Sequence, residues 1–237
     1  RVTSLLSTLY LLFEKKGLLN SIPDRPKAHL FSDWVFHNNQ VQTLKYELKW
    51  LKRASAKAGT KLILLKGAAY IAGNLPAAQG RLISDIDLLV PLEKIQHYEA
   101  VLAEFGWKPG EQDPYDERYF RQWMHEIPPL GHIKRGSVLD VHHTILPPTA
   151  KLKPDAKKLF ETIQEIKPGV WVLAPTDMVI HSATHLFHEG EFEHALRDLL
   201  DLDSLLRHFG ETDDQFWAHL LPRAIELNLD RPLYYAL

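Results

Sequence analysis

The segment Ser84–Val90 (Ser-Asp-Ile-Asp-Leu-Leu-Val) places two carboxylates two positions apart inside an apolar run. On a β-strand, residues i and i+2 point to the same side, so Asp85 and Asp87 would project together, with Ile86 and Leu88 buried behind them. Aspartate is disfavoured inside strands, and two close carboxylates repel each other unless a cation lies between them. Hard divalent ions, above all Mg²⁺, prefer carboxylate oxygens. The pair therefore predicts a divalent-cation site, of the kind that supports phosphoryl or nucleotidyl transfer.

The size and charge of the chain limit what it can be. Its 237 residues are 45% hydrophobic, enough for one large domain or two small ones. The formal net charge of −2 argues against a general nucleic-acid binder, which normally carries a basic excess. Cysteine is absent, which excludes disulfides, thiolate zinc sites and a cysteine nucleophile.

The chain also carries no sign of a membrane segment. Its longest apolar runs, such as Leu62–Leu65 and Leu88–Val90, are far too short to cross a bilayer, and no signal peptide is evident. We therefore expect a cytoplasmic protein with no membrane partner. The sequence predicts no oligomeric state.

Hydrophobic spacing divides the chain into three parts. We expect an N-terminal helical segment over residues 1–58, a mixed core over 59–148 and a C-terminal helical region over 149–237. The expected fold class is α+β, with a small mixed β-sheet flanked by helices from both ends of the chain.

Local signals place individual elements within this plan. Ser21–Pro26 is turn-rich, and the helix that follows would end at Gly59, a typical C-cap residue. Thr176 is the predicted N-cap of a later helix. The predicted extended segments cover residues 61–65, 82–90, 137–144 and 169–173. The predicted helices cover residues 31–58, 92–105, 156–163, 176–189, 192–209 and 213–227.

Three chemically suggestive features follow one another in the core. Lys66-Gly67-Ala68 forms a glycine turn between a short apolar strand and a helix, the Asp85–Asp87 pair comes next, and Asp140 stands on a later predicted strand. In this order the sequence resembles the DNA polymerase β-like nucleotidyltransferase superfamily. More narrowly, it looks like the family of uncharacterised bacterial nucleotidyltransferases. The matching segments are Leu64–Ala69, Gly80-Arg81, Ser84–Val90 and Leu139–His142, with weaker matches in His181–His185 and Leu196–Leu206.

The resemblance implies a polymerase β-like core over residues 59–148 and a two-metal reaction. Asp85, Asp87 and Asp140 would be the catalytic residues and would hold two Mg²⁺ ions against the triphosphate of an NTP substrate. Asp140 would also help to deprotonate the acceptor hydroxyl. A nucleoside monophosphate would pass to a small molecule or a protein, and pyrophosphate would leave; nucleic acid is not expected as the acceptor.

The same resemblance implies a set of nucleotide contacts, namely Lys66, Gly67, Ala68, Arg81, Ser84, His142 and His185. The sequence departs from the superfamily at Ala68, where serine or glycine is usual. The hydroxyl expected to contact phosphate is therefore missing. Lys66, Arg81 and Ser84 would compensate. Each has a structural alternative: a solvated lysine, an arginine paired with a surface acid, and a serine bonded to the local backbone. His142 would otherwise pack beneath the site.

His181, His185 and His188 recur at helical spacing, so they share one face of a helix. Such a face could bind zinc, but a polar stripe along a cleft or facing solvent is the simpler interpretation, and His185 is then the first candidate for ligand contact. The aromatic group from Tyr115 to Trp123 could stack on a base, although core or rim packing explains it equally simply.

Two functions remain open from the sequence. The first is the enzyme just described; the alternative is a catalytically weak nucleotide-binding or antitoxin-like, partner-binding protein with the same fold. Replacing Asp85 or Asp87 by Asn should abolish Mg²⁺-dependent nucleotide binding. It should also leave the metal-free fold intact or more stable, because carboxylate repulsion is relieved.

Overall fold

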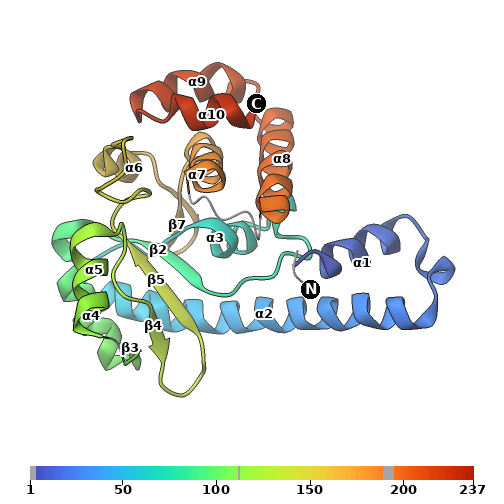
Figure 1. Cartoon of the computed structure of the whole chain (residues 1–237), viewed down its shortest axis with the longest axis horizontal. Coiled ribbons are helices and arrows are strands. Elements are labelled where there is room, and N and C mark those ends of the chain that lie inside the picture. Colours follow the sequence, from blue (N-terminus) through green and yellow to red (C-terminus); the bar gives the residue numbers. More distant parts are fainter. Residues whose placement is uncertain (1–3, 112, 189–194) are drawn as a thin grey trace.

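The computed structural model describes residues 4–111, 113–188 and 195–237. Within these residues the strands form one seven-stranded mixed sheet, with helices on both of its sides (Figure 1). The order across the sheet is β3-β4-β5-β2-β1-β7-β6. The strands are β1 Ile63–Leu64, β2 Ile86–Leu89, β3 Trp107–Pro109, β4 Leu130–His132, β5 Val138–His142, β6 Gln164–Lys167 and β7 Val170–Val172. An α+β fold with a mixed sheet is thus confirmed.

The helices gather into two groups around the sheet. They are α1 Leu6–Lys15, α2 Asp24–Lys57, α3 Lys66–Ala72, α4 Ile95–Glu104, α5 Pro114–Trp123, α6 Ala156–Glu161, α7 Pro175–His188, α8 Ala195–Thr212, α9 Phe216–Glu226 and α10 Asp230–Ala236. The long helix α2 runs beneath the sheet in the view of Figure 1, and α1 packs against the part of α2 that projects beyond the body. Helices α7 to α10 pack on one another above the sheet.

The centre of the sheet fixes the geometry of the site. Strands β2 and β5 are parallel neighbours, and their register sets Asp87 opposite Asp140. On its other side β2 pairs with β1, and the backbone N–H of Leu65 donates to the carbonyl of Asp87 over 2.9 Å. The start of α3 is therefore held beside the carboxylate strand.

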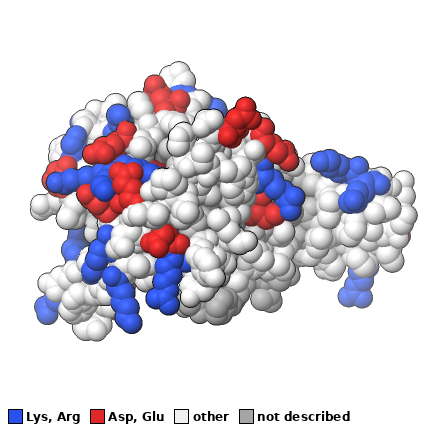
Figure 2. Space-filling view, turned by 90° about the horizontal axis from the view of Figure 1, so that it is seen from above, with Lys and Arg blue, Asp and Glu red and all other residues white. Residues whose placement is uncertain are grey.

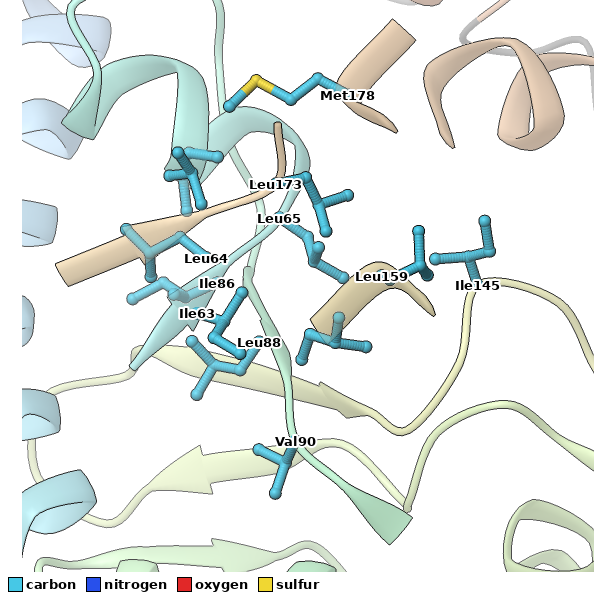
Figure 3. Close-up of a cluster of buried hydrophobic side chains, with 14 of the residues drawn as sticks. Ile63, Leu64, Leu65, Ile86, Leu88, Val90, Ile145, Leu159, Leu173 and Met178 are labelled. Atoms are coloured by element: carbon cyan, nitrogen blue, oxygen red, sulfur yellow. The ribbon is translucent and has the colours of Figure 1, made fainter. Parts of the chain in front are cut away.

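The faces of these strands that turn away from the carboxylates build the core. Ile86 and Leu88 are 5% and 1% exposed, as their alternation with the aspartates predicts. Figure 3 shows them gathered with buried residues of β1, α6 and α7. The labelled members of this cluster are Ile63, Leu64, Leu65, Ile86, Leu88, Val90, Ile145, Leu159, Leu173 and Met178.

The carboxylate strand is shorter than the sequence predicts. β2 begins at Ile86, so Asp85 lies in the bend before it and not on the strand. The reason lies at Ile83, two residues before Asp85. The side-chain amide of Gln40 on α2 accepts a hydrogen bond from the N–H of Ile83 over 3.1 Å and donates one to the carbonyl of Ile83. A helix side chain thus satisfies the backbone groups that a neighbouring strand would otherwise pair.

The C-terminal region contributes strands as well as helices. β7 pairs in parallel with β1, and β6 pairs antiparallel with β7, so residues 164–172 extend the sheet. The sequence predicted an extended piece near β7 but not its partner β6. The division of the chain at residues 58 and 148 stays a prediction.

Several helix boundaries differ from expectation. α2 begins at Asp24 and includes Pro26, which the first turn tolerates because its N–H positions need no intrahelical partner. α7 begins at Pro175, so Thr176 lies within its first turn and is not the N-cap, since proline is well suited to the first helical position. Gly59 follows α2 with φ of +62°, as a C-capping glycine should. The predicted boundaries near 189 and 192 lie outside the described residues.

None of the helices in the described ranges combines enough length with enough apolar character to cross a bilayer.

Candidate active site

Asp85, Asp87 and Asp140 meet at one point. Each offers a carboxylate oxygen, and these three oxygens lie within 4.8 Å of one another. The parallel pairing of β2 with β5 brings Asp87 and Asp140 together, and the bend before β2 turns Asp85 toward them. The three acidic side chains therefore form the cluster that the sequence predicts, and this cluster is able to hold a divalent cation.

The folded structure disfavours the ionised form of Asp140. Its pKa is raised to about 7 by burial, by the charge of Asp85 and then by those of Glu126 and Asp87. Its Oδ1 is buried, and none of the described residues gives it a hydrogen-bond partner. A buried carboxylate oxygen without a partner is unfavourable in the bare protein, and a cation would satisfy it. The donor set therefore fits a metal ion.

Asp87 is stabilised as a carboxylate by its own neighbours. Burial would raise the pKa of Asp87, but the Lys66 ammonium, 3.1 Å from Oδ1, and His142, whose Nε2 is 3.0 Å from the same oxygen, together lower it. Replacing Asp87 by Asn would remove these attractions. For Asp87, these attractions oppose the gain in metal-free stability expected from relieving repulsion, and the stability of the variant stays a prediction.

Lys66 reaches Asp87 through an unusual backbone conformation. It opens α3 with φ of +43°, the left-handed region that residues other than glycine seldom adopt. Such a conformation costs roughly 1–3 kcal/mol, and it persists only where the surrounding structure enforces it. Two interpretations were left open for Lys66, a nucleotide contact and a solvated lysine. In the structure its ammonium lies at the cavity wall and is ion-paired with Asp87.

Arg81 is buried and is 8% exposed. Its Nε donates to Oδ2 of Asp201 on α8 over 2.6 Å, so its acidic partner is a buried one and not the surface acid considered above. The guanidinium also fills the space beside Gly67, where an added Cβ would lie 2.0 Å from Nη1 of Arg81. A side chain at position 67 would therefore have to displace the guanidinium of Arg81 and the side chain of Ile83.

The remaining predicted contacts divide between the cavity and the core. Ser84 donates to Oδ2 of Asp85 over 2.9 Å, which differs from the backbone bond considered above. The cavity at the carboxylates has a volume of about 580 Å³, and its lining includes Ser84, His142 and His185. Ala68 is fully buried, and neither it nor Gly67 lines the cavity, so their side of the turn faces the interior.

The histidine face of α7 lines the same cavity. His181, His185 and His188 all belong to its wall, which places the helix along the cleft, as the spacing suggested. His181 is buried, and burial lowers its pKa well below the usual value, with the charge of Lys66 adding to the effect. His185 lies 3.7 Å from a carboxylate oxygen of Asp198.

Among the residues of this wall that sequence reasoning missed are three polar ones. His125 and Glu126 come from the segment before β4, and Arg197 comes from α8. The segment at Glu126 pairs antiparallel with β5 at His142, a neighbour 16 positions away in the chain. Polar character was visible at 118–125, but no spacing rule links these residues to Asp140. Among the aromatic residues, Tyr119 also lines the cavity.

A mixed sheet that presents three carboxylates to a cavity with basic side chains is an arrangement suited to nucleotide chemistry. The chain belongs to the family described as uncharacterised nucleotidyltransferases, whose family model matches residues 1–237. No functionally curated protein matches the sequence.

The solved structures that are similar to this chain include the following two. One is the solution structure of the antibiotic-resistance factor ANT(2'')-Ia, at 16% identity and a TM-score of 0.41, with 77% of this chain and 97% of that one covered. The other is the crystal structure of an antigenic nucleotidyltransferase-like protein from Paracoccidioides brasiliensis, at 16% identity and a TM-score of 0.43, with 78% and 89% covered. The family assignment rests on the match over the whole chain.

Proposed function

We propose that this nucleotidyltransferase depends on Mg²⁺ and moves a nucleoside monophosphate from an NTP to a hydroxyl of a small molecule or a protein. The observation that carries the proposal is the convergence of Asp85, Asp87 and Asp140 on one cavity. Family membership supports the reaction class, and the chemistry of the three carboxylates supports the metal.

The three aspartates would hold the ions. Mg²⁺ bound there would neutralise the triphosphate and stabilise the attacking and leaving oxygens of an in-line displacement. Asp140 has the buried oxygen that lacks a partner in the described structure, and Asp87 is already fixed by Lys66 and His142. Asp87 is therefore positioned before any substrate arrives, and Asp140 has an oxygen available for the ion.

In the proposed reaction, the acceptor oxygen forms a bond to the α-phosphorus. The bond from that phosphorus to the β-phosphate oxygen breaks, and pyrophosphate leaves with the electron pair. The hydroxyl proton passes to a carboxylate of the site. Asp140, which lies opposite Asp87 on the neighbouring strand, is the carboxylate proposed for this role.

The cavity suits a nucleotide with a small acceptor or an exposed hydroxyl of a protein. Its volume of about 580 Å³ is typical of small-molecule sites. Arg81 and Arg197 give the wall basic character that complements phosphate, and Lys66, Ser84 and His185 are proposed as further contacts. Gly67 and Ala68 would contribute through their backbone alone.

Surface charge argues against a nucleic-acid acceptor. The net charge is −2, and on the face in Figure 2 basic and acidic side chains are interspersed and form no broad basic surface. Backbone recognition of nucleic acid depends on clustered positive charge.

Calorimetry with ATP, GTP, CTP and UTP in Mg²⁺ tests the binding part of the proposal. We expect at least one NTP to bind the parent, and Asp85→Asn and Asp87→Asn to lose that binding. Asp214→Asn, at an exposed position, is the matched control and should bind as the parent does. Unchanged nucleotide binding in both site variants would refute the metal site.

An assay for pyrophosphate release tests turnover. Release should depend on Mg²⁺ and on an acceptor, with panels of hydroxylated small molecules and of proteins run separately. Nucleotide binding without release from either panel would favour the alternative, a nucleotide-binding or partner-binding protein with this fold. Ala68, in place of the usual serine or glycine, is the residue that keeps this alternative open.

A further inference from the structure

We propose that His125, Glu126 and His142 form a second metal site, for a zinc-class transition-metal ion, beside the aspartate cluster. Each residue offers one ligand atom, and the three atoms lie within 4.8 Å of one another. The proposal goes beyond nucleotidyl transfer and does not depend on it, since metal binding can be measured without substrate.

The backbone holds these three residues in place. The N–H of Ile127 donates to the carbonyl of Val141 over 3.1 Å, and the N–H of His143 donates to the carbonyl of His125 over 2.9 Å. Glu126 is bridged to His142 between these two hydrogen bonds. A site preformed in this way avoids much of the entropy that ordering its ligands would otherwise require.

The contacts of His142 indicate which of its ring nitrogens would bind a metal. Nε2 lies 3.0 Å from Oδ1 of Asp87, within hydrogen-bond distance of that carboxylate. Nδ1, on the other side of the ring, lies 3.3 Å from Oε2 of Glu126 and is the nitrogen that faces the proposed site. His142 is only 2% exposed, so both contacts are made inside the protein.

Nδ1 of His142 and Oε2 of Glu126 are spaced as two ligands of one ion would be. Tetrahedral zinc, with bonds of about 2.0–2.2 Å to nitrogen and oxygen, holds its ligand atoms roughly 3.3–3.5 Å apart. The observed separation of 3.3 Å meets this requirement. Metal-bound histidines typically donate their other N–H to a carboxylate, and Asp87 is that carboxylate here. Direct contact of His142 with both carboxylates, with no ion between them, is the competing arrangement, and the experiment below decides between the two.

The two clusters call for different metals. Two imidazoles and one carboxylate favour Zn²⁺ or Co²⁺, whereas the all-oxygen set of Asp85, Asp87 and Asp140 favours Mg²⁺. All three residues of the new site line the cavity, so an ion can enter from it. Three protein ligands leave a fourth position for water or a polar group of a substrate. Through His142, the bound ion would also fix the orientation of Asp87.

Cobalt serves as the spectroscopic probe. The full chain, stripped of metal with a chelator, is titrated with Co²⁺, and we expect visible absorption of a tetrahedral complex at one equivalent, displaced by Zn²⁺. Glu126→Gln and His125→Gln should each weaken Co²⁺ binding about tenfold or more. His97→Gln, at an exposed position on α4, is the control for loss of an imidazole and should bind as the parent does.

Asp85→Asn separates the two clusters. It should keep the cobalt spectrum, since Asp85 is no ligand of the proposed site. Loss of the spectrum in Asp85→Asn, or parent-like Co²⁺ binding in Glu126→Gln, would place the ion at the aspartates and overturn the proposal. Absence of Co²⁺ binding by the parent would overturn it as well. Circular dichroism of each variant confirms that it is folded.

Discussion

Asp140→Asn should make the metal-free protein more stable at neutral and alkaline pH. The folded structure raises the pKa of Asp140 from 3.8 to about 7, because the carboxylate is buried and faces other acidic groups. Each tenfold change in an ionisation constant corresponds to 1.36 kcal/mol, so ionised Asp140 costs the folded state up to about 4 kcal/mol. Partial solvent access and relaxation reduce this to roughly 2–4 kcal/mol. Asparagine is similar in shape and carries no charge.

The sign and the pH window follow from linkage. The folded state keeps the Asp140 proton up to about pH 7, whereas the unfolded chain releases it near pH 4. Raising the pH through this interval therefore destabilises the parent relative to Asp140→Asn. The advantage of the variant should be absent below pH 4, grow between pH 4 and pH 7, and stay constant above.

Urea unfolding in a chelating buffer at several pH values measures this difference. Asp214→Asn, an exposed carboxyl, is the control and should show no pH-dependent gain. Adding Mg²⁺ should stabilise the parent and leave Asp140→Asn nearly unchanged, since only a state that binds the ion is stabilised by it. A difference that does not vary with pH, or a variant less stable than the parent at pH 8, would refute the reasoning.

Two further substitutions test the packing beside the site and an ion pair between α7 and α9. Gly67→Ala should destabilise the fold by about 1–3 kcal/mol in urea unfolding, because its Cβ would meet Nη1 of Arg81 at 2.0 Å. Gly110→Ala, whose Cβ would have no atom within 4 Å, is the control and should be nearly neutral. Equal effects of the two substitutions would contradict the contact. Arg223→Met should cost about 3–5 kcal/mol, because it removes a 2.7 Å ion pair from Asp177, whose side chain is fully buried; a loss below 1 kcal/mol would show that the pair is dispensable.

The sequence predicted the centre of the sheet well because the signal there is local. Alternation along residues 86–88 places Ile86 and Leu88 in the core and Asp87 on the side of the other two carboxylates, and the structure bears this out, although Asp85 precedes the strand. Gly59 likewise ends α2 as a capping glycine should. Asp140 joins Asp87 because β2 and β5 are neighbours, which the family resemblance suggested and the strand pattern alone did not.

What the sequence missed depends on contacts between distant segments. Arg81 pairs with Asp201, 120 positions away, and no spacing rule connects the two. Glu126 reaches the site through a single antiparallel bridge to His142, too short to produce an alternating pattern. Asp85 precedes the strand because Gln40, on a helix, forms a hydrogen bond with the backbone of Ile83. Each case is a tertiary contact that overrides or adds to a local preference.

The most direct test of the central claim is anomalous diffraction from crystals grown with Mn²⁺, in place of Mg²⁺, and a non-hydrolysable NTP analogue. The account predicts anomalous density between the carboxylates of Asp85, Asp87 and Asp140, with the triphosphate against it in the cavity. An ordered nucleotide whose phosphates lie elsewhere, with no manganese at the three carboxylates, would contradict the account.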